Sequence, residues 1–217
     1  MELSDFLNNK QTVLGKEINV NALIYITAGD KALNEDNYNL AIIKYTNAIE
    51  LDPNNYYPFM KRGKCFQIIQ EYNKAIQDLL NSIKLNSDFE NNQTIAECYL
   101  FKNEFMDAIE YFQSAIIKIE RIEEIDTHSV SGRDYSATKA RTFNNLSVCF
   151  FKSNQLEKAI ESSTKGINAN PNYPNNYSIR GMVYLQKGEK LKAKNDLQMA
   201  VSLGDSRSQM ILNQFGL

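Results

Sequence analysis

The side chains that most often carry out catalysis are scarce in this chain. Its 217 residues include one histidine and three cysteines. A Ser–His or Cys–His catalytic pair would have to use His128, which lies in a segment of Ser, Thr and Gly, residues 127–134, that predicts a loop. The sequence has no glycine-rich phosphate loop and no nucleophile elbow. We therefore expect a protein that is not an enzyme and has no catalytic residues.

The three cysteines, Cys65, Cys98 and Cys149, could in principle bind a metal or form a disulfide. A metal site would need ligands at close spacing, but the chain has no Cys-x-x-Cys pair and only His128 to add. Free cysteine otherwise behaves as a small hydrophobic residue. We expect three reduced, buried thiols, no metal and no cofactor.

Charge and hydropathy exclude two classes of partner. The net charge is −2 and no Lys/Arg run is longer than Lys61–Arg62, whereas phosphate binding needs a clustered basic face. Apolar runs such as Ala22–Ala28 are far shorter than the ~20 residues of a membrane span. The acidic start, Met1–Asp5, lacks the basic region of a secretory signal. We expect a cytoplasmic protein that binds neither nucleic acid nor membrane.

A repeat indicates the elements that carry these residues. Five alanines recur at intervals of 34, 33, 51 and 34 residues: Ala41, Ala75, Ala108, Ala159 and Ala193. Small residues lie twelve positions before them (Gly29, Gly63, Ala96, Ser147, Gly181) and seven after (Ala48, Ser82, Ala115, Gly166, Ala200). Two helices can cross closely only where their facing side chains are small. A period of about 34 residues is typical of a helical repeat.

With these small residues go aromatic residues at the fourth and eleventh places, such as Phe59 and Phe66, and prolines after the second helices, Pro53 and Pro171. On these residues the chain resembles the tetratricopeptide repeat family. The resemblance implies an all-α, right-handed solenoid of five helix pairs over residues 22–55, 56–88, 89–122, 140–173 and 174–207. The chain departs from the family pattern at Asn92, Ser163, Ser87 and Asp205. The three cysteines all fall at the tenth place of a unit, a position that in this family is buried.

The segments outside the five units are expected to be helical as well. Residues 1–21 predict an amphipathic capping helix, with Leu3, Phe6, Leu7 and Leu14 on one face, followed by a connector from Gly15; partial disorder is the alternative. Residues 208–217 predict a capping helix that begins near Ser206 and covers the last unit with Met210, Ile211 and Phe215. The insertion at residues 123–139 predicts two lengthened helices that meet at a Ser/Gly turn. This insertion is either a binding face or a simple overhang that has no partner.

The resemblance also implies a concave groove lined by the first helix of each pair. Amides there can hydrogen-bond an extended peptide, and Met, Phe and Tyr can contact its side chains. The predicted function is a scaffold, monomer or weak dimer, that binds a protein or peptide segment in this groove. The predicted groove residues are Tyr57, Met60, Lys61, Lys64, Gln93, Glu97, Phe101, Asn144, Asn145, Val148, Phe151, Ser178, Ile179 and Met182.

Two alternatives remain open. One is a structural, self-associating subunit of a larger assembly. The other is a chaperone adaptor, which in this family holds an acidic C-terminal tail with a clamp of Lys, Asn and Arg. The clamp uses five positions over three consecutive units. If it starts in the first unit, these positions hold Ile26, Asp30, Lys61, Glu90 and Thr94. If it starts in the third unit, they hold Gln93, Glu97, Asn145, Asn175 and Ile179. Only Asn145 matches, so an adaptor would lack the cations that bind a carboxylate.

Overall fold

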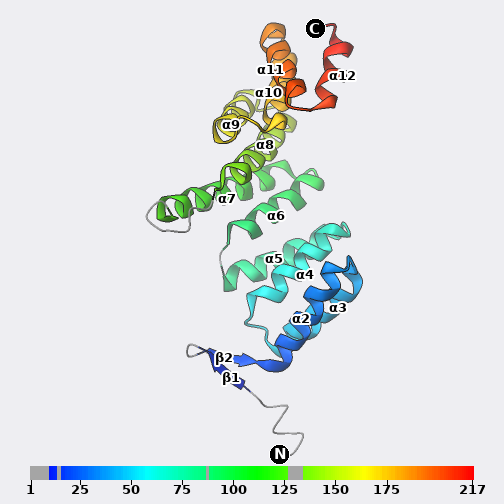
Figure 1. Ribbon diagram of the computed structural model, residues 1–217, viewed down its shortest axis with the longest axis vertical. Coiled ribbons are helices and arrows are strands. Elements are labelled where there is room, and N and C mark those ends of the chain that lie inside the picture. The colour runs from blue at the N-terminus through cyan, green and yellow to red at the C-terminus, as the bar shows by residue number, and fades with distance from the viewer. Residues whose placement is uncertain (1–9, 14–15, 87, 127–133) are drawn as a thin grey trace, which may run out of the picture. The chain divides into compact units, whose positions relative to one another are not determined.

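The computed structural model describes residues 10–13, 16–86, 88–126 and 134–217 (Figure 1). These residues form eleven helices and one two-stranded hairpin. The chain divides into two compact units, which we describe separately: unit 1, residues 1–98, and unit 2, residues 99–217. In both units consecutive helices pack as antiparallel pairs, which confirms the all-α repeat fold.

Unit 1 begins with β1 (Lys10–Val13) and β2 (Lys16–Asn19), which pair antiparallel with Lys10 opposite Asn19. The helix predicted to extend to Leu14 is therefore wrong at residues 10–13, and the predicted connector contains a strand. Residues 1–9, which carry the rest of that prediction, lie outside the described residues. Four complete helices follow, α2 (Val20–Asn34), α3 (Tyr38–Leu51), α4 (Tyr56–Ile68) and α5 (Tyr72–Leu85), and then the larger part of α6 (Phe89–Phe101).

Unit 2 contains α7 (Phe105–Asp126), α8 (Ser136–Lys152), α9 (Leu156–Ala169), α10 (Pro174–Gln186), α11 (Lys190–Ser202) and α12 (Ser206–Phe215). Within the predicted insertion, α7 extends to Asp126 and α8 starts at Ser136, and an ion pair of 2.6 Å joins Glu123 to Lys139. The predicted turn between them, with His128, lies outside the described residues.

Asn and Asp side chains set the starts of several helices. The side-chain oxygens of Asn19, Asn37 and Asn55 accept hydrogen bonds from backbone N–H groups in the first turns of α2, α3 and α4, at 3.1, 3.2 and 3.1 Å. Asp134 does the same for Ser136 at the start of α8, at 2.8 Å. These bonds satisfy donors that have no partner within the helix.

The turn between the two helices of each pair has the same backbone conformation in all five pairs. One residue, at the fifteenth place, has a positive φ: Asp36 (55°), Gln70 (65°), Asn103 (61°), Asn154 (59°) and Gly188 (78°). The next residue donates its N–H to a carbonyl five residues earlier, as from Asn37 to Ala32 at 2.8 Å. Left-handed residues of this kind end helices by satisfying their last carbonyls.

The repeated alanines form the centre of the core, as the spacing predicted. All five are fully buried, and so are Tyr45, Leu79, Phe112 and Leu197 of the second helices. A Cβ placed on Gly63 would lie 2.9 Å from Cγ of Leu79, and one on Gly181 would lie 2.9 Å from Cγ of Leu197. The helices therefore cross too closely for any side chain at these two positions.

The cysteines are free and buried, as expected. Burial raises the pKa of Cys65 to about 11 and the pKa of Cys149 to about 12. Because the thiolate is the reactive form of cysteine, these two thiols are held in their unreactive form at neutral pH.

The last helix differs from the prediction in the side chains that it buries. Met210 was expected to help cover the last repeat, but it is 70% exposed. Ser208 and Leu212 are buried instead, because they lie on the side of α12 that packs on the preceding helices. The helix ends at Gly216, which has the left-handed conformation.

The described residues were compared with the requirements of a metal site and of a membrane span. They include no cluster of three or more His, Cys, Asp and Glu side chains placed to hold a metal ion. Of the described helices, none is both long and apolar enough to span a membrane.

Candidate functional site

In unit 1 an arginine fixes α4 between its neighbours. The Nε and Nη2 atoms of Arg62 donate to the two carboxylate oxygens of Asp78 on α5, at 2.7 and 2.8 Å. Its Nη1 atom donates to the hydroxyl of Thr46 on α3 at 2.8 Å. A two-point contact between a guanidinium and a carboxylate sets orientation as well as distance. The face of α4 that carries Tyr57, Lys61 and Lys64 is thereby held in a fixed direction.

Unit 2 repeats this arrangement around α10. Arg180 donates to both carboxylate oxygens of Asp196 on α11, at 2.7 and 2.8 Å, and to the hydroxyl of Thr164 on α9 at 3.0 Å. Hydrogen bonding to Asp196 raises the pKa of Arg180, which stays charged. The face of α10 that carries Ser178 and Met182 is therefore positioned in the same way.

The predicted groove residues of unit 1 largely contact one another or their neighbours. The hydroxyl of Tyr57 donates to the Asp30 carboxylate at 3.1 Å, and the hydroxyl of Tyr45 donates to it at 2.7 Å. Burial and the charge of Asp30 raise the pKa of Tyr57 to about 12. The ammonium of Lys61 lies 5.2 Å from the centre of the Tyr57 ring. Met60 is buried.

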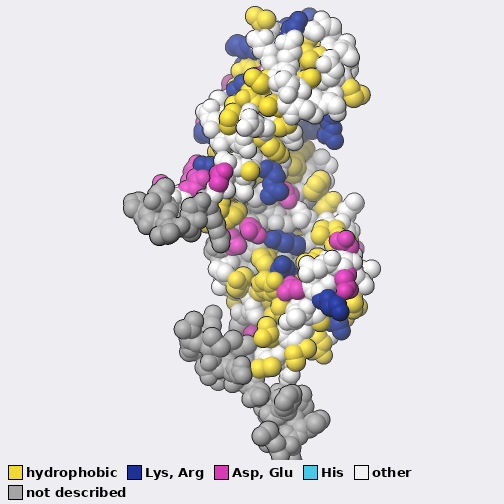
Figure 2. All heavy atoms as spheres, in the orientation of Figure 1, with side chains coloured by type: hydrophobic (Ala, Val, Ile, Leu, Met, Phe, Trp, Pro, Cys, Tyr) yellow, Lys and Arg dark blue, Asp and Glu magenta, His cyan; other side chains and the backbone are white. Residues whose placement is uncertain are grey.

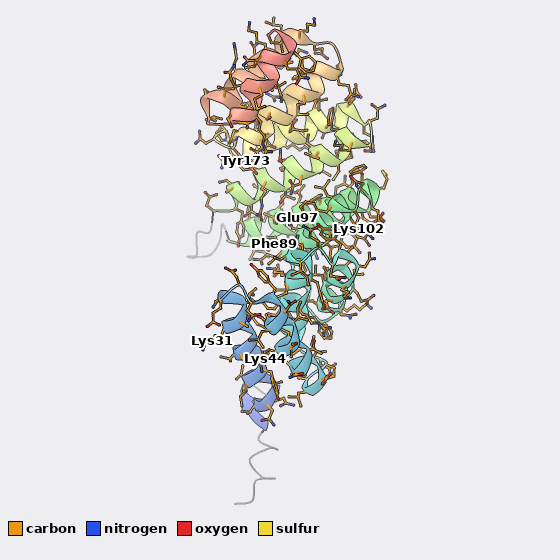
Figure 3. The ribbon with its side chains drawn as sticks, turned by 90° about the vertical axis from the view of Figure 1, so that its right-hand side faces the viewer. Lys31, Lys44, Phe89, Glu97, Lys102 and Tyr173 are labelled. Atoms are coloured by element: carbon orange, nitrogen blue, oxygen red, sulfur yellow. The ribbon has the colours of Figure 1, made fainter. Side chains whose placement is uncertain are left out.

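The charges on α4 and α6 of unit 1 are also paired. Lys64 makes an ion pair of 3.0 Å with Glu90, and the amide of Gln67 donates to Glu97 at 3.0 Å. Glu97 is labelled on α6 in Figure 3. Gln93, another predicted groove residue, is buried. Any ligand of this face would have to displace existing contacts.

In unit 2, two of the predicted groove residues are buried and serve packing. The amide of Asn144 donates to the backbone carbonyl of Asn175 at 3.0 Å and so joins α8 to the start of α10. Ile179 is buried as well. Neighbouring helices cover both positions, so little of either side chain reaches the surface.

The other predicted residues of unit 2 remain accessible to different degrees. Phe101 and Met182 are 60% and 37% exposed. Asn145, Val148, Phe151 and Ser178 are half-buried. The hydroxyl of Ser178 is hydrogen-bonded to the hydroxyl of Ser208 on α12 at 3.0 Å. The amide of Asn145 makes no side-chain hydrogen bond with any described residue.

Two of these residues line a pocket that also involves the last helix. It has a volume of about 340 Å³ and is lined by Phe151, Met182, Leu185, Gln186, Ile211, Gln214 and Phe215. The walls therefore come from α8, α10 and α12. The sequence placed Ile211 and Phe215 over the last repeat but did not include them among the groove residues, so their contribution to this pocket was missed. Their apolar character was the available signal.

Two further apolar hollows lie elsewhere. In unit 2, one of about 410 Å³ lies between α7 and α9. Its lining residues include Phe143, Leu146 and Phe150 of α8 and Lys158 and Lys165 of α9. In unit 1, one of about 440 Å³ lies on α2 beside Leu23, Ile24 and Lys31, the last of which is labelled in Figure 3. Neither contains a predicted groove residue.

Comparison with known proteins identifies a family and several relatives. The model of the RNPP family C-terminal domain matches residues 24–201. The tetratricopeptide repeat and J domain-containing co-chaperone DNJ1 of Cryptococcus neoformans var. grubii is 22% identical over 207 residues, which are 95% of this chain and 39% of that protein. This chain spans between 20% and 40% of the length of the curated relatives that it matches.

Solved structures share the fold. A crystal structure of MamA protein is 23% identical with a TM-score of 0.72, over 88% of this chain and 96% of that one. The structure of YrrB, described as a TPR protein with an unusual peptide-binding site, is 15% identical with a TM-score of 0.72, over 89% of this chain and 92% of that one. At these identities the likeness shows the helical repeat fold alone.

Proposed function

We propose that this chain, which belongs to the family defined by the RNPP family C-terminal domain, binds an extended protein segment along α8 and α10 of unit 2. It is a tetratricopeptide repeat protein, which is a non-catalytic binding scaffold. One observation carries the choice of unit 2. There the accessible predicted residues keep an unused amide, on Asn145, and open into an apolar pocket beside Phe151 and Met182. In unit 1 three of the predicted residues, Tyr57, Lys64 and Glu97, already have hydrogen-bond or ion-pair partners on neighbouring helices.

A peptide needs both kinds of group that this face offers. The free amide of Asn145 can donate to and accept from a peptide backbone, whereas Val148 and Phe151, further along α8, can contact its side chains. YrrB, which shares the fold, is described as having a peptide-binding site, and this supports the same use here.

Selection of peptides from a random library displayed against the immobilised chain would supply a ligand. We expect Asn145→Ala to weaken binding of the selected peptides about five-fold or more, because a lost neutral hydrogen bond costs ~1 kcal/mol and its partner is left unpaired. Phe151→Ala should weaken it further. Asn195→Ala, on an exposed position of α11, is the matched control and should have no effect. Unchanged affinity in both groove variants would refute the proposal.

A chaperone adaptor is the second candidate, because DNJ1 is named a co-chaperone. Asn145 is still the one side chain that matches the clamp, so any adaptor function would use other contacts.

Light scattering tests the remaining alternative, a self-associating subunit. We expect a monomer or weak dimer, and a stable oligomer at low concentration would favour the assembly role.

A further inference from the structure

The pocket between α8, α10 and α12 is apolar in composition. Five of its seven lining residues are apolar, and the other two, Gln186 and Gln214, are neutral amides. Phe215 and Met182 expose much of their side chains. Gathered exposed apolar side chains mark sites where a partner is bound. The volume of about 340 Å³ lies within the range of ~300–1,000 Å³ found for small-ligand sites.

The wall supplied by α12 is held in place before any ligand binds. Asp205 caps the helix by accepting the Arg207 N–H at 3.2 Å and the Ser208 hydroxyl at 2.7 Å. The hydroxyl oxygens of Ser208 and Ser178 of α10 lie 3.0 Å apart, within hydrogen-bond distance, and Leu212 is buried. A preformed site avoids much of the entropy that a mobile wall would lose on binding.

The three helices that line the pocket carry basic but no acidic side chains. The sequences of α8, α10 and α12 contain no Asp or Glu. Their cations are Lys139, Arg141, Lys152, Arg180 and Arg207. On the face shown in Figure 2, acidic side chains are scarce over α10–α12, whereas acidic and basic side chains are interspersed over unit 1.

Lys152 is the cation next to the pocket. It directly follows Phe151 at the end of α8, is exposed, and has no ion-pair partner among the described residues. The nearest turns hold acidic residues that already have cationic partners, because Lys187 pairs with Glu157 at 3.2 Å and with Glu189 at 3.4 Å. Lys152 therefore offers a positive charge with no ion-pair partner among the described residues, one residue after the pocket-lining Phe151.

We propose that the pocket takes one Leu or Met side chain from an acidic segment of the partner, and that Lys152 pairs with a carboxylate beside that side chain. Ile211 and Phe215 of α12 are then the residues that determine specificity. The inference rests on the proposed function of the same face and adds the chemistry of the ligand. The bound segment needs an apolar residue within an acidic stretch but does not need a terminal carboxylate.

Three synthetic peptides of nine residues, fluorescently labelled and amidated at the C-terminus, test the proposal by anisotropy with the full chain. The first has a central Leu flanked by Glu, the second replaces this Leu with Ser, and the third replaces each Glu with Gln. We expect the first to bind at least ten-fold more tightly than either of the others. Equal binding of the first two, or affinity of the first weaker than about 1 mM, would overturn the proposal.

Variants of the chain locate the contact. Phe215→Ala should weaken binding of the Leu peptide about ten-fold, whereas Met210→Ala, on an exposed position of α12 outside the pocket, should leave it unchanged. Lys152→Glu should weaken it and flatten its salt dependence, and Lys190→Glu on α11 is the matched control. Circular dichroism of each variant checks that the fold is intact.

The two proposals can fail separately. If library-selected peptides lose affinity in Asn145→Ala but not in Phe215→Ala, the groove binds a ligand and the apolar pocket is not used. If a pure Glu peptide without Leu binds as tightly as the first, Lys152 and its neighbours act as a general anion site and the proposal is wrong.

Discussion

Arg62 of unit 1 and Arg180 of unit 2 make the same set of contacts. Each donates two hydrogen bonds to an aspartate sixteen residues later and one to a threonine sixteen residues earlier. The rings beside them differ, because Phe59 and Phe66 lie about 6 Å from Arg62, whereas Tyr177 lies 5.9 Å from Arg180. The contacts that orient the first helix are therefore the same in the two units.

The faces that these arginines orient are different. In unit 1 Asp30, Lys64 and Glu90 are paired within the unit. In unit 2 the helices α8, α10 and α12 lack acidic residues, and Lys152 directly follows Phe151, which lines an apolar pocket. The comparison shows that the residues that fix a helix and those that can meet a partner occupy separate positions of the repeat. The second set can change while the first is kept.

The strongest test of the shared part removes the aspartates. Asp78→Ala and Asp196→Ala should each lower the free energy of unfolding by about 3 kcal/mol or more, because each leaves a guanidinium without its buried partner. Urea denaturation followed by circular dichroism measures the change. Replacing both members of a pair, as in Arg180→Met with Asp196→Leu, should recover most of the loss. A large cost in one unit and none in the other would break the equivalence.

The close helix crossings provide a second, smaller test. Alanine normally stabilises a helix by about 1 kcal/mol relative to glycine. Gly63→Ala and Gly181→Ala should instead lower the free energy of unfolding by about 1–3 kcal/mol, because the new Cβ would lie 2.9 Å from Leu79 or Leu197. The sign of the change, measured by the same denaturation, decides the matter. A stabilised variant would mean that the crossing in that unit can widen freely.

The smallest effect is expected at the turns between paired helices. Gln70 has a φ of 65°, and Gly188 occupies the equivalent place in unit 2 with a φ of 78°. Gln70→Gly should stabilise the chain by about 1 kcal/mol, and Gly188→Gln should destabilise it by a similar amount, because only glycine adopts this conformation without strain. Opposite shifts of the melting temperature would sharpen the comparison. Shifts of the same sign would show that the two turns are not equivalent.

The repeat could be predicted from the sequence because its requirement is local and steric. A small residue at each helix crossing leaves a clear spacing, and the alanines and glycines revealed it. The N-terminal hairpin was not predicted, because its strands, Lys10–Val13 and Lys16–Asn19, have four residues each, and the apolar spacing of such short segments does not distinguish a strand from a helix.

The candidate site could be predicted only in part. A position in the repeat indicates which face a side chain lies on but not how deeply neighbours cover it. Asn144 and Ile179 are covered for this reason, whereas Phe151 and Met182 are accessible and line the pocket. The sequence placed Ile211 and Phe215 over the last unit but did not count them with the groove, because amphipathic spacing does not specify which side chains of the neighbouring helices they meet.

The common backbone of the five turns has a consequence for how such a chain can change in evolution. Asp36, Gln70, Asn103, Asn154 and Gly188 differ in type but share one conformation, so any of these turns can connect a first helix to a second one. A genetic crossover between two of them would exchange or duplicate a full period and leave every joint intact. The turns are thus natural points at which this array can gain or lose repeats.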